Sequence, residues 1–203
     1  MFQLSTAPII LASGSAARRK VLEAAGLSFT TRPAAIDEAE IKRSARAEGA
    51  SAEDAATLLA SFKAKRVATR EPNAIVIGAD QILVCETTWF DKPQDAETAR
   101  QQLLALRGKP HVLATAIVCQ RGEQRVWQHV ARPRLFMRVF SDAFLDAYLA
   151  AEGAAVTTSV GAYRLEGLGI HLFERIEGEQ TAILGLPMPP LLGFLRQHGV
   201  LLG

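Results

Sequence analysis

The sequence predicts an α/β or α+β fold built on a mixed, twisted sheet with flanking helices. The chain of 203 residues is 49% hydrophobic and 22% charged, as expected for a globular protein with a core of ordinary size. Strand-like and helix-like segments intermix along the whole length, and no repeat or low-complexity linker separates them. We therefore expect residues 1–203 to form one domain, or two closely joined lobes with a cleft between them.

A strand, a loop and a helix are predicted at the start of the chain. Residues 8–12 (PIILA) form a short apolar run, and residues 13–16 (SGSA) carry only small side chains. Apolar residues between 21 and 25 share one helical face, and Gly26 is a typical helix end.

The middle of the chain predicts a long helix and two short strands. Ser51 is a typical N-cap, the first turn after it is acidic, and apolar side chains share one face up to Arg70. Residues 74–85 (AIVIGADQILVC) are predicted to be two strand-like runs interrupted at residues 78–81.

Helices and strands intermix again in the second half. Asp95 caps a predicted helix that ends before Gly108. The other predicted elements are a hairpin over residues 111–130 with its turn at Arg121 and Gly122, a strand at 134–140, a helix from Ser141 to Gly153, a strand at 170–177 and a closing helix at 189–199.

Charge and cysteine content exclude several classes of protein. Lys and Arg number 23 against 21 for Asp and Glu, and a net charge of +2 is too small for stable nucleic-acid binding, although a local basic site remains open. Cys85 and Cys119 lie in separate apolar runs without Cys-x-x-Cys or His companions, which argues against a zinc site and favours a reducing cytoplasm. The run at residues 8–12 is far shorter than a signal-peptide core or a membrane span. We expect a cytoplasmic protein that does not enter the membrane.

Two arginines, Arg18 and Arg19, stand in the first turn of the predicted N-terminal helix, where the helix dipole favours acidic side chains. Ser13 and Ser15 precede them between strand and helix, and their hydroxyls and nearby backbone amides can surround a phosphate. A bound anion would make the arginines charge-assisted donors. The alternative is an exposed helix that simply carries two arginines, and spacing alone does not decide between the two. The segment is neither a Walker loop nor a GxGxxG motif.

Three further charged positions carry candidate chemistry. Asp80 lies between two apolar runs, where a carboxylate needs a metal or a cationic side chain, although a turn aspartate in a hairpin is the simpler explanation of its position. Asp37 and Glu38, in isolation, are typical of a solvated loop, and Lys92 is an ordinary lysine unless a phosphate lies near it.

Several of these residues fall into blocks that occur in a recognisable order. The blocks are LASGSAARRKVLEAAGL (residues 11–27), IDE (36–38), LASFKA (59–64), IGADQ (77–81), DKP (91–93), LRGKPHVLATAI (106–117) and GAYRLEGLGIHLFERIEGEQTAILGLP (161–187). Over nearly the full chain they resemble the Maf family of nucleoside triphosphate pyrophosphatases. The glutamine of GADQ and the glutamate of LEGLG resemble the 7-methyl-GTP subgroup, because the dTTP/UTP subgroup typically has GADT and IQG.

The resemblance implies a Maf- or ITPase-like, anvil-like fold and hydrolysis of the α,β-phosphoanhydride of a nucleotide, with Mg²⁺ or Mn²⁺, to a monophosphate and pyrophosphate. It implies that Ser13, Ser15, Arg18 and Arg19 bind the substrate. The arginines suit this task because phosphoryl transfer depends chiefly on positioning and electrostatics.

The resemblance also implies catalytic roles for Asp80, Lys92 and Lys63. The lysines would neutralise phosphate oxygens, while Glu38 and Asp80 would hold the metal through oxygen ligands. We assign Asp80 chiefly to the role of the base that takes a proton from the attacking water.

Base preference is assigned to Ala17, Gln81 and Glu166. A carboxylate such as Glu166 can accept both N1–H and the 2-amino group of a guanine edge, whereas an amide suits uracil or thymine better. Gln81 would tune the choice, and Ala17 departs from the bulkier residue frequent in the 7-methyl-GTP subgroup. Without the resemblance, the simpler interpretation of Glu166 is a solvent-facing residue before a Gly-Leu-Gly turn.

Two alternatives to a 7-methyl-GTP pyrophosphatase remain. One is a dTTP/UTP pyrophosphatase of the same family, and the other is a regulator of cell division that binds nucleotide without hydrolysis. Against the regulator, Glu38, Lys63, Asp80 and Lys92 all carry side chains competent for catalysis. The resemblance further implies a homodimer.

Overall fold

The computed structural model describes residues 2–4 and 7–203. Its helices and strands, in chain order, are β1 (Ile9–Leu11), α1 (Ala16–Ala24), β2 (Thr30–Thr31), α2 (Glu38–Ala47), α3 (Ala52–Ala68), β3 (Ile75–Cys85), β4 (Thr88–Phe90), α4 (Ala96–Leu106), β5 (Pro110–Arg121), β6 (Gln124–Ala131), β7 (Arg134–Met137), α5 (Asp142–Glu152), β8 (Phe173–Glu177), α6 (Gln180–Ile183) and α7 (Met188–Gln197). Short 3-10 turns cover Gly153–Thr157, Val160–Ala162 and Leu168–Leu172.

The chain divides into two compact units. The first contains the residues up to Gln81, together with Thr115–Ala131 and Glu179–Gly203. The second contains Ile82–Ala114 and Arg132–Gly178, so that β3 and β5 each contribute residues to both.

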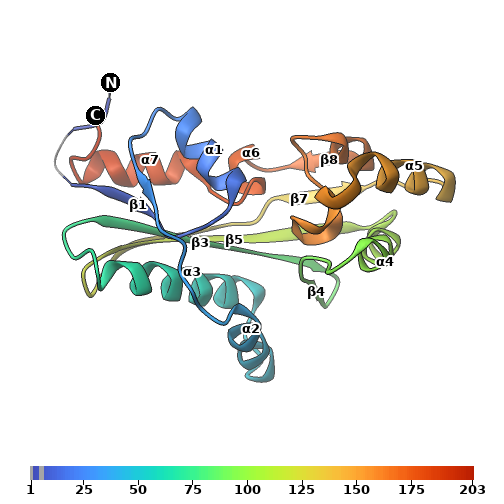
Figure 1. The fold of residues 1–203 in the computed structure, drawn as a ribbon, viewed down its shortest axis with the longest axis horizontal. Coiled ribbons are helices and arrows are strands. Elements are labelled where there is room, and N and C mark those ends of the chain that lie inside the picture. Colours follow the sequence, from blue (N-terminus) through green and yellow to red (C-terminus); the bar gives the residue numbers. More distant parts are fainter. Residues whose placement is uncertain (1, 5–6) are drawn as a thin grey trace. The chain divides into compact units, whose positions relative to one another are not determined.

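The first unit is a mixed sheet covered by helices on both faces. Strand β1 pairs in parallel with β2 and with β3, and β5 forms an antiparallel hairpin with β6. Helices α1 and α7 lie on one side of these strands and α3 on the other (Figure 1). The expected mixed α/β architecture with flanking helices is confirmed.

The core of this unit gathers apolar side chains that are distant in sequence. Leu11 of β1, Leu22 of α1, Ile77 of β3, Ile117 of β5 and Leu191 of α7 all belong to it and are fully buried. Strand residues alternate between the two faces of a sheet, so the odd-numbered residues of β3 share the face that packs against α1 and α7.

The second unit combines short antiparallel strand pairs with α4 and α5. The end of β3 pairs with β4, the start of β5 pairs with β7, and β7 pairs with β8. His111 is 2% exposed, and its Nε2 lies 2.8 Å from the hydroxyl of Tyr163. Burial lowers the pKa of His111 from 6.5 to about 4, against a smaller opposing effect of a backbone hydrogen bond with Lys109.

Most predicted elements are confirmed, and the caps expected at Ser51, Asp95 and Ser141 are present, together with a cap at Ser15 that was not predicted. Ser15, Ser51, Asp95 and Ser141 each accept a hydrogen bond from a backbone N–H in the first turn of the helix that they cap. No helix of the described residues is long and apolar enough to cross a membrane. Cys85 and Cys119 are both buried free thiols.

Three predictions are wrong in detail. Residues 78–81 do not interrupt a hairpin, because β3 is one continuous strand of 11 residues, and Asp80 is therefore a strand residue. Glu38 is not in a loop but is the first residue of α2, and the exposed Asp37 before it caps that helix by accepting from the Glu40 N–H. The strand expected at 170–177 begins only at Phe173, after a 3-10 turn.

Candidate active site

A close contact between α3 and β3 brings two of the candidate catalytic residues, Lys63 and Asp80, together. A side chain at Gly78 would place its Cβ 2.1 Å from the carbonyl oxygen of Ala60 and 2.8 Å from the backbone nitrogen of Ala64. The helix backbone therefore lies directly against the strand, which only glycine in the strand and small residues in the helix permit. Because side chains alternate along a strand, Asp80 shares the face of Gly78 and points toward the same helix.

Lys63 of α3 forms an ion pair with each of two carboxylates. Its Nζ lies 2.5 Å from Oδ1 of Asp80 and 2.8 Å from Oε1 of Glu38. The side chains of Lys63 and Asp80 are 8% and 6% exposed, whereas that of Glu38 is 47% exposed. The second oxygen of Asp80, Oδ2, is buried without a hydrogen-bond partner. A buried orphan oxygen of this kind is a site for a metal, a water or a proton to occupy.

Charged neighbours hold Glu38 in its ionised form. Partial burial alone would raise the pKa of its carboxyl group. The hydrogen bond from Lys63 and the positive charges of Lys63, Lys42 and Arg18 outweigh that effect and lower the pKa of Glu38 below its ordinary value. Glu38 therefore offers an anionic oxygen at neutral pH.

The segment between β1 and α1 helps to orient the side chain of Arg18. The Oγ of Ser13 accepts hydrogen bonds from the Ser15 N–H and from Nη1 of Arg18, both at 3.2 Å, and Ser15 caps α1. Nε of Arg18 donates to the carbonyl oxygen of Gly185 at 2.9 Å. Burial lowers the pKa of Arg18 below its ordinary value, because it outweighs the negative charges of Asp80 and Glu38, which act in the opposite direction. Its two acceptors are uncharged, so an anion would complete the site.

Gln81 makes contacts that the sequence did not suggest. Its Nε2 donates to Oγ1 of Thr115 at 2.8 Å and to the carbonyl oxygens of Ala182 and Ile183, both at 3.1 Å. Thr115 and Gly185 were not singled out from the sequence. Both lie in blocks that resemble the Maf family, which is the one signal that could have drawn attention to them.

The donor set fits a divalent cation only in part. Among residues 2–4 and 7–203, no group of three or more His, Cys, Asp or Glu side chains is arranged to hold a metal. Asp80, with its orphan Oδ2, and Glu38 supply two carboxylates. Mg²⁺ is commonly held by one or two carboxylates together with substrate phosphates and water. The residues present therefore fit a cation that arrives with a nucleotide.

Two further predicted site residues, Ala17 and Arg19, lie in the first turns of α1. Arg19 is 54% exposed in its side chain and forms an ion pair with Glu23 one turn along the helix, at 3.6 Å. Ala17 is partly buried in the first turn of α1. Lys92 and Glu166 belong to the second unit, and both are exposed.

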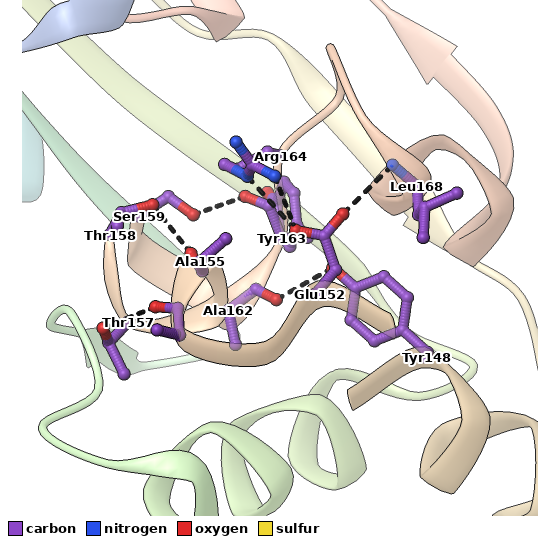
Figure 2. A network of polar contacts seen from close by, with 11 residues as sticks. Tyr148, Glu152, Ala155, Thr157, Thr158, Ser159, Ala162, Tyr163, Arg164 and Leu168 are labelled. Atoms are coloured by element: carbon purple, nitrogen blue, oxygen red, sulfur yellow. Dashed lines mark hydrogen bonds and ion pairs between the residues drawn. The ribbon is translucent and has the colours of Figure 1, made fainter. Parts of the chain in front are cut away.

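The loop that carries Glu166 is anchored at both ends by one carboxylate. Oε2 of Glu152 accepts from Nε and Nη2 of Arg164, at 3.2 and 2.8 Å, and Oε1 accepts from the Leu168 N–H at 3.2 Å (Figure 2). The hydroxyl of Tyr148, one turn earlier on α5, donates to the carbonyl oxygen of Ala162. Glu166 thus lies in a short loop whose ends are fixed to α5.

Comparison with known proteins identifies the family. Residues 8–198 match the family described as Maf-like protein. A protein of Granulibacter bethesdensis named nucleoside triphosphate pyrophosphatase is 57% identical over 193 residues, which are 95% of this chain and 98% of the relative. A protein of Rhizobium meliloti named 7-methyl-GTP pyrophosphatase is 48% identical over 193 residues, which are 95% of this chain and 97% of that relative. The chain belongs to the Maf family.

Proposed function

We propose that this protein hydrolyses the α,β-phosphoanhydride of a nucleoside triphosphate, and that its substrate is 7-methyl-GTP or a related modified nucleotide. The observation that carries the proposal is the buried Asp80. One of its oxygens is bound to Lys63, and the other is buried without a partner, ready to accept a proton or a cation. The names of the relatives in Granulibacter bethesdensis and Rhizobium meliloti support the same activity.

The side chains of the first unit suit phosphoryl transfer. Arg18 offers guanidinium N–H groups beyond those that bind Ser13 and Gly185, and these would neutralise phosphate oxygens. Lys63 pairs with Oδ1 of Asp80 and orients its carboxylate, so that Oδ2 is available to take the proton of an attacking water.

A divalent cation, Mg²⁺ or Mn²⁺, would be held by Asp80 and Glu38. When bound, it would neutralise phosphate charge and favour attack at phosphorus. Lys92 is proposed as a further cation for the phosphates. This role rests on the DKP motif alone.

Preference for a guanine-type base is assigned to Glu166. A carboxylate accepts both donors of the guanine edge, and methylation at N7 makes the ring cationic, which should strengthen that pairing. Gln81 has its amide nitrogen engaged within the protein, so only its Oε1 remains to influence the base. We further propose that the protein acts in the cytoplasm as a homodimer, on the strength of the family resemblance.

The proposal is tested by a screen of pyrophosphate release. Purified protein is assayed with 7-methyl-GTP, GTP, dTTP and UTP, each with Mg²⁺, with Mn²⁺ and with a chelator. We expect the highest kcat/KM for 7-methyl-GTP and no turnover with the chelator. Preferred turnover of dTTP or UTP would assign the protein to the other activity of the family. Tight binding without turnover of any nucleotide would favour the non-catalytic regulator.

A further inference from the structure

The last two residues of α6, at the start of the turn over residues 182–185, are held by side chains from two strands. Gln81 of β3 donates to the carbonyl oxygens of Ala182 and Ile183, and Oγ1 of Thr115 on β5 donates to that of Ala182 at 3.1 Å. The Gly185 N–H also donates to the carbonyl of Ala182, at 3.0 Å. The carbonyl oxygen of Ala182 therefore accepts three hydrogen bonds, two of them from side chains of β3 and β5, and these fix the turn to the sheet.

The same turn supports the guanidinium of Arg18. The carbonyl oxygen of Gly185 accepts from Nε of Arg18 at 2.9 Å. A Cβ at residue 185 would lie 3.1 Å from that Nε, and the backbone φ of +90° strongly favours glycine. The guanidinium packs directly against the backbone of the turn, so a shift of the turn would shift Arg18.

Thr115 is the residue that connects these contacts. It is fully buried, and its hydroxyl accepts from Nε2 of Gln81 while donating to the carbonyl of Ala182. A hydroxyl that accepts and donates at once fixes which end of the Gln81 amide faces the turn. Valine has the same shape but neither capacity, whereas serine keeps both.

We propose that Thr115 is a positioning residue for phosphate binding: it holds the turn at residues 182–185 and thereby aims the guanidinium of Arg18. This inference rests on the proposed function, in which Arg18 binds the triphosphate. Thr115 acts on the phosphates through Arg18 and does not read the base. Its loss should therefore affect all nucleotides alike.

The experiment compares Thr115→Val with Thr115→Ser and with a matched control, Thr57→Val. The Thr57 hydroxyl also donates to a backbone carbonyl, that of Glu53 at 2.7 Å, within α3 and six residues before Lys63. We expect Thr115→Val to lower kcat/KM about tenfold for 7-methyl-GTP and UTP equally, because small displacements of a binding group have large kinetic effects. We expect the Kd for inorganic pyrophosphate to rise about fivefold, a size typical of one lost hydrogen bond. Thr115→Ser and Thr57→Val should keep wild-type values.

A double-mutant cycle tests whether Thr115 acts through Arg18. If it does, Thr115→Val changes kcat/KM by less than about twofold when it is added to Arg18→Ala, since coupled residues are non-additive. An equal loss in both backgrounds would overturn the inference. So would a folded Thr115→Val protein with wild-type kinetics, or a changed preference between the two nucleotides. If Arg18→Ala alone leaves kcat/KM unchanged, the proposed role of Arg18 in substrate binding fails, and Thr115 cannot act through it.

Discussion

Replacing Asp80 by asparagine separates its chemical role from its structural one. Asparagine keeps the shape of the side chain and one oxygen that can face Lys63. It places an amide nitrogen, which donates, where the carboxylate has an acceptor. In the wild type, Oδ1 lies 2.5 Å from Nζ of Lys63, and Oδ2 is buried without a partner. The variant therefore cannot accept the proton of an attacking water, and it is a poor ligand for a cation.

The expected loss of activity is large and the expected loss of stability is small. Removing a general base usually costs a factor of about 10² to 10⁴ in rate, which is roughly 2.7 to 5.5 kcal/mol in the activation free energy. Lys63 keeps its ion pair with Glu38 at 2.8 Å, so the buried ammonium group is not left without a partner. Weakening one hydrogen bond to a charged group should lower the free energy of unfolding by about 1 to 3 kcal/mol.

Steady-state pyrophosphate release and thermal unfolding are measured on Asp80→Asn and on a matched control, Asp146→Asn. Asp146 also pairs with a cationic side chain, Arg100, but its own side chain is 63% exposed. We expect the control to keep full activity. Asp80→Asn activity within about tenfold of the wild type would refute the base assignment. An unfolded Asp80→Asn protein would show that Asp80 is required for the fold, and its catalytic role would then have no support from this variant.

Other positions give further tests. Arg18→Ala should weaken substrate binding and turnover without lowering the Tm of the free protein. Arg19→Ala should have a smaller effect on binding and turnover, because Arg19 is 54% exposed and paired with Glu23. A lower Tm with unchanged kinetics would show that these arginines have a structural role. Glu166→Gln should lower the ratio of kcat/KM for 7-methyl-GTP over UTP by about five- to a hundredfold, and an unchanged ratio would show that Glu166 does not contact the base. Burial lowers the pKa of His111 from 6.5 to about 4, so His111 binds a proton more readily in the unfolded chain than in the folded one. The free energy of unfolding should therefore decrease by up to roughly 3 kcal/mol as the pH falls from 7 to 4. The same pH dependence in His111→Gln, measured by urea unfolding, would contradict this explanation.

Local features of the chain were predicted well because their causes are local. The predicted N-caps Ser51, Asp95 and Ser141 bond to backbone groups three residues away, so the sequence beside them contains both partners. Helix ends at glycine follow from the same short-range chemistry.

Strand β3 shows where the local pattern misleads. Gly78 and Asp80 are residues typical of a turn, and they predicted a break in the strand. In the structure Gly78 is required by the approach of Ala60 and Ala64 from α3, and Asp80 is stabilised by Lys63. These partners are 14 to 18 residues away in sequence, so no pattern within the strand could indicate them.

For the candidate site, too, the sequence indicated the residues and the tertiary structure determined their contacts. Residue types and their order in the chain were enough to select Ser13, Arg18, Glu38, Lys63 and Asp80 through the family resemblance, because each side chain has the charge or hydroxyl that phosphate chemistry needs.

Folding decides which of these groups are in contact. Lys63 bridges Asp80 and Glu38 because α3 lies directly against β3. The amide nitrogen of Gln81 is bound to Thr115 and to the carbonyl oxygens of two residues about 100 positions later in the chain. Such contacts depend on the packing of elements that are far apart in the chain, and a single sequence carries no local signal for them.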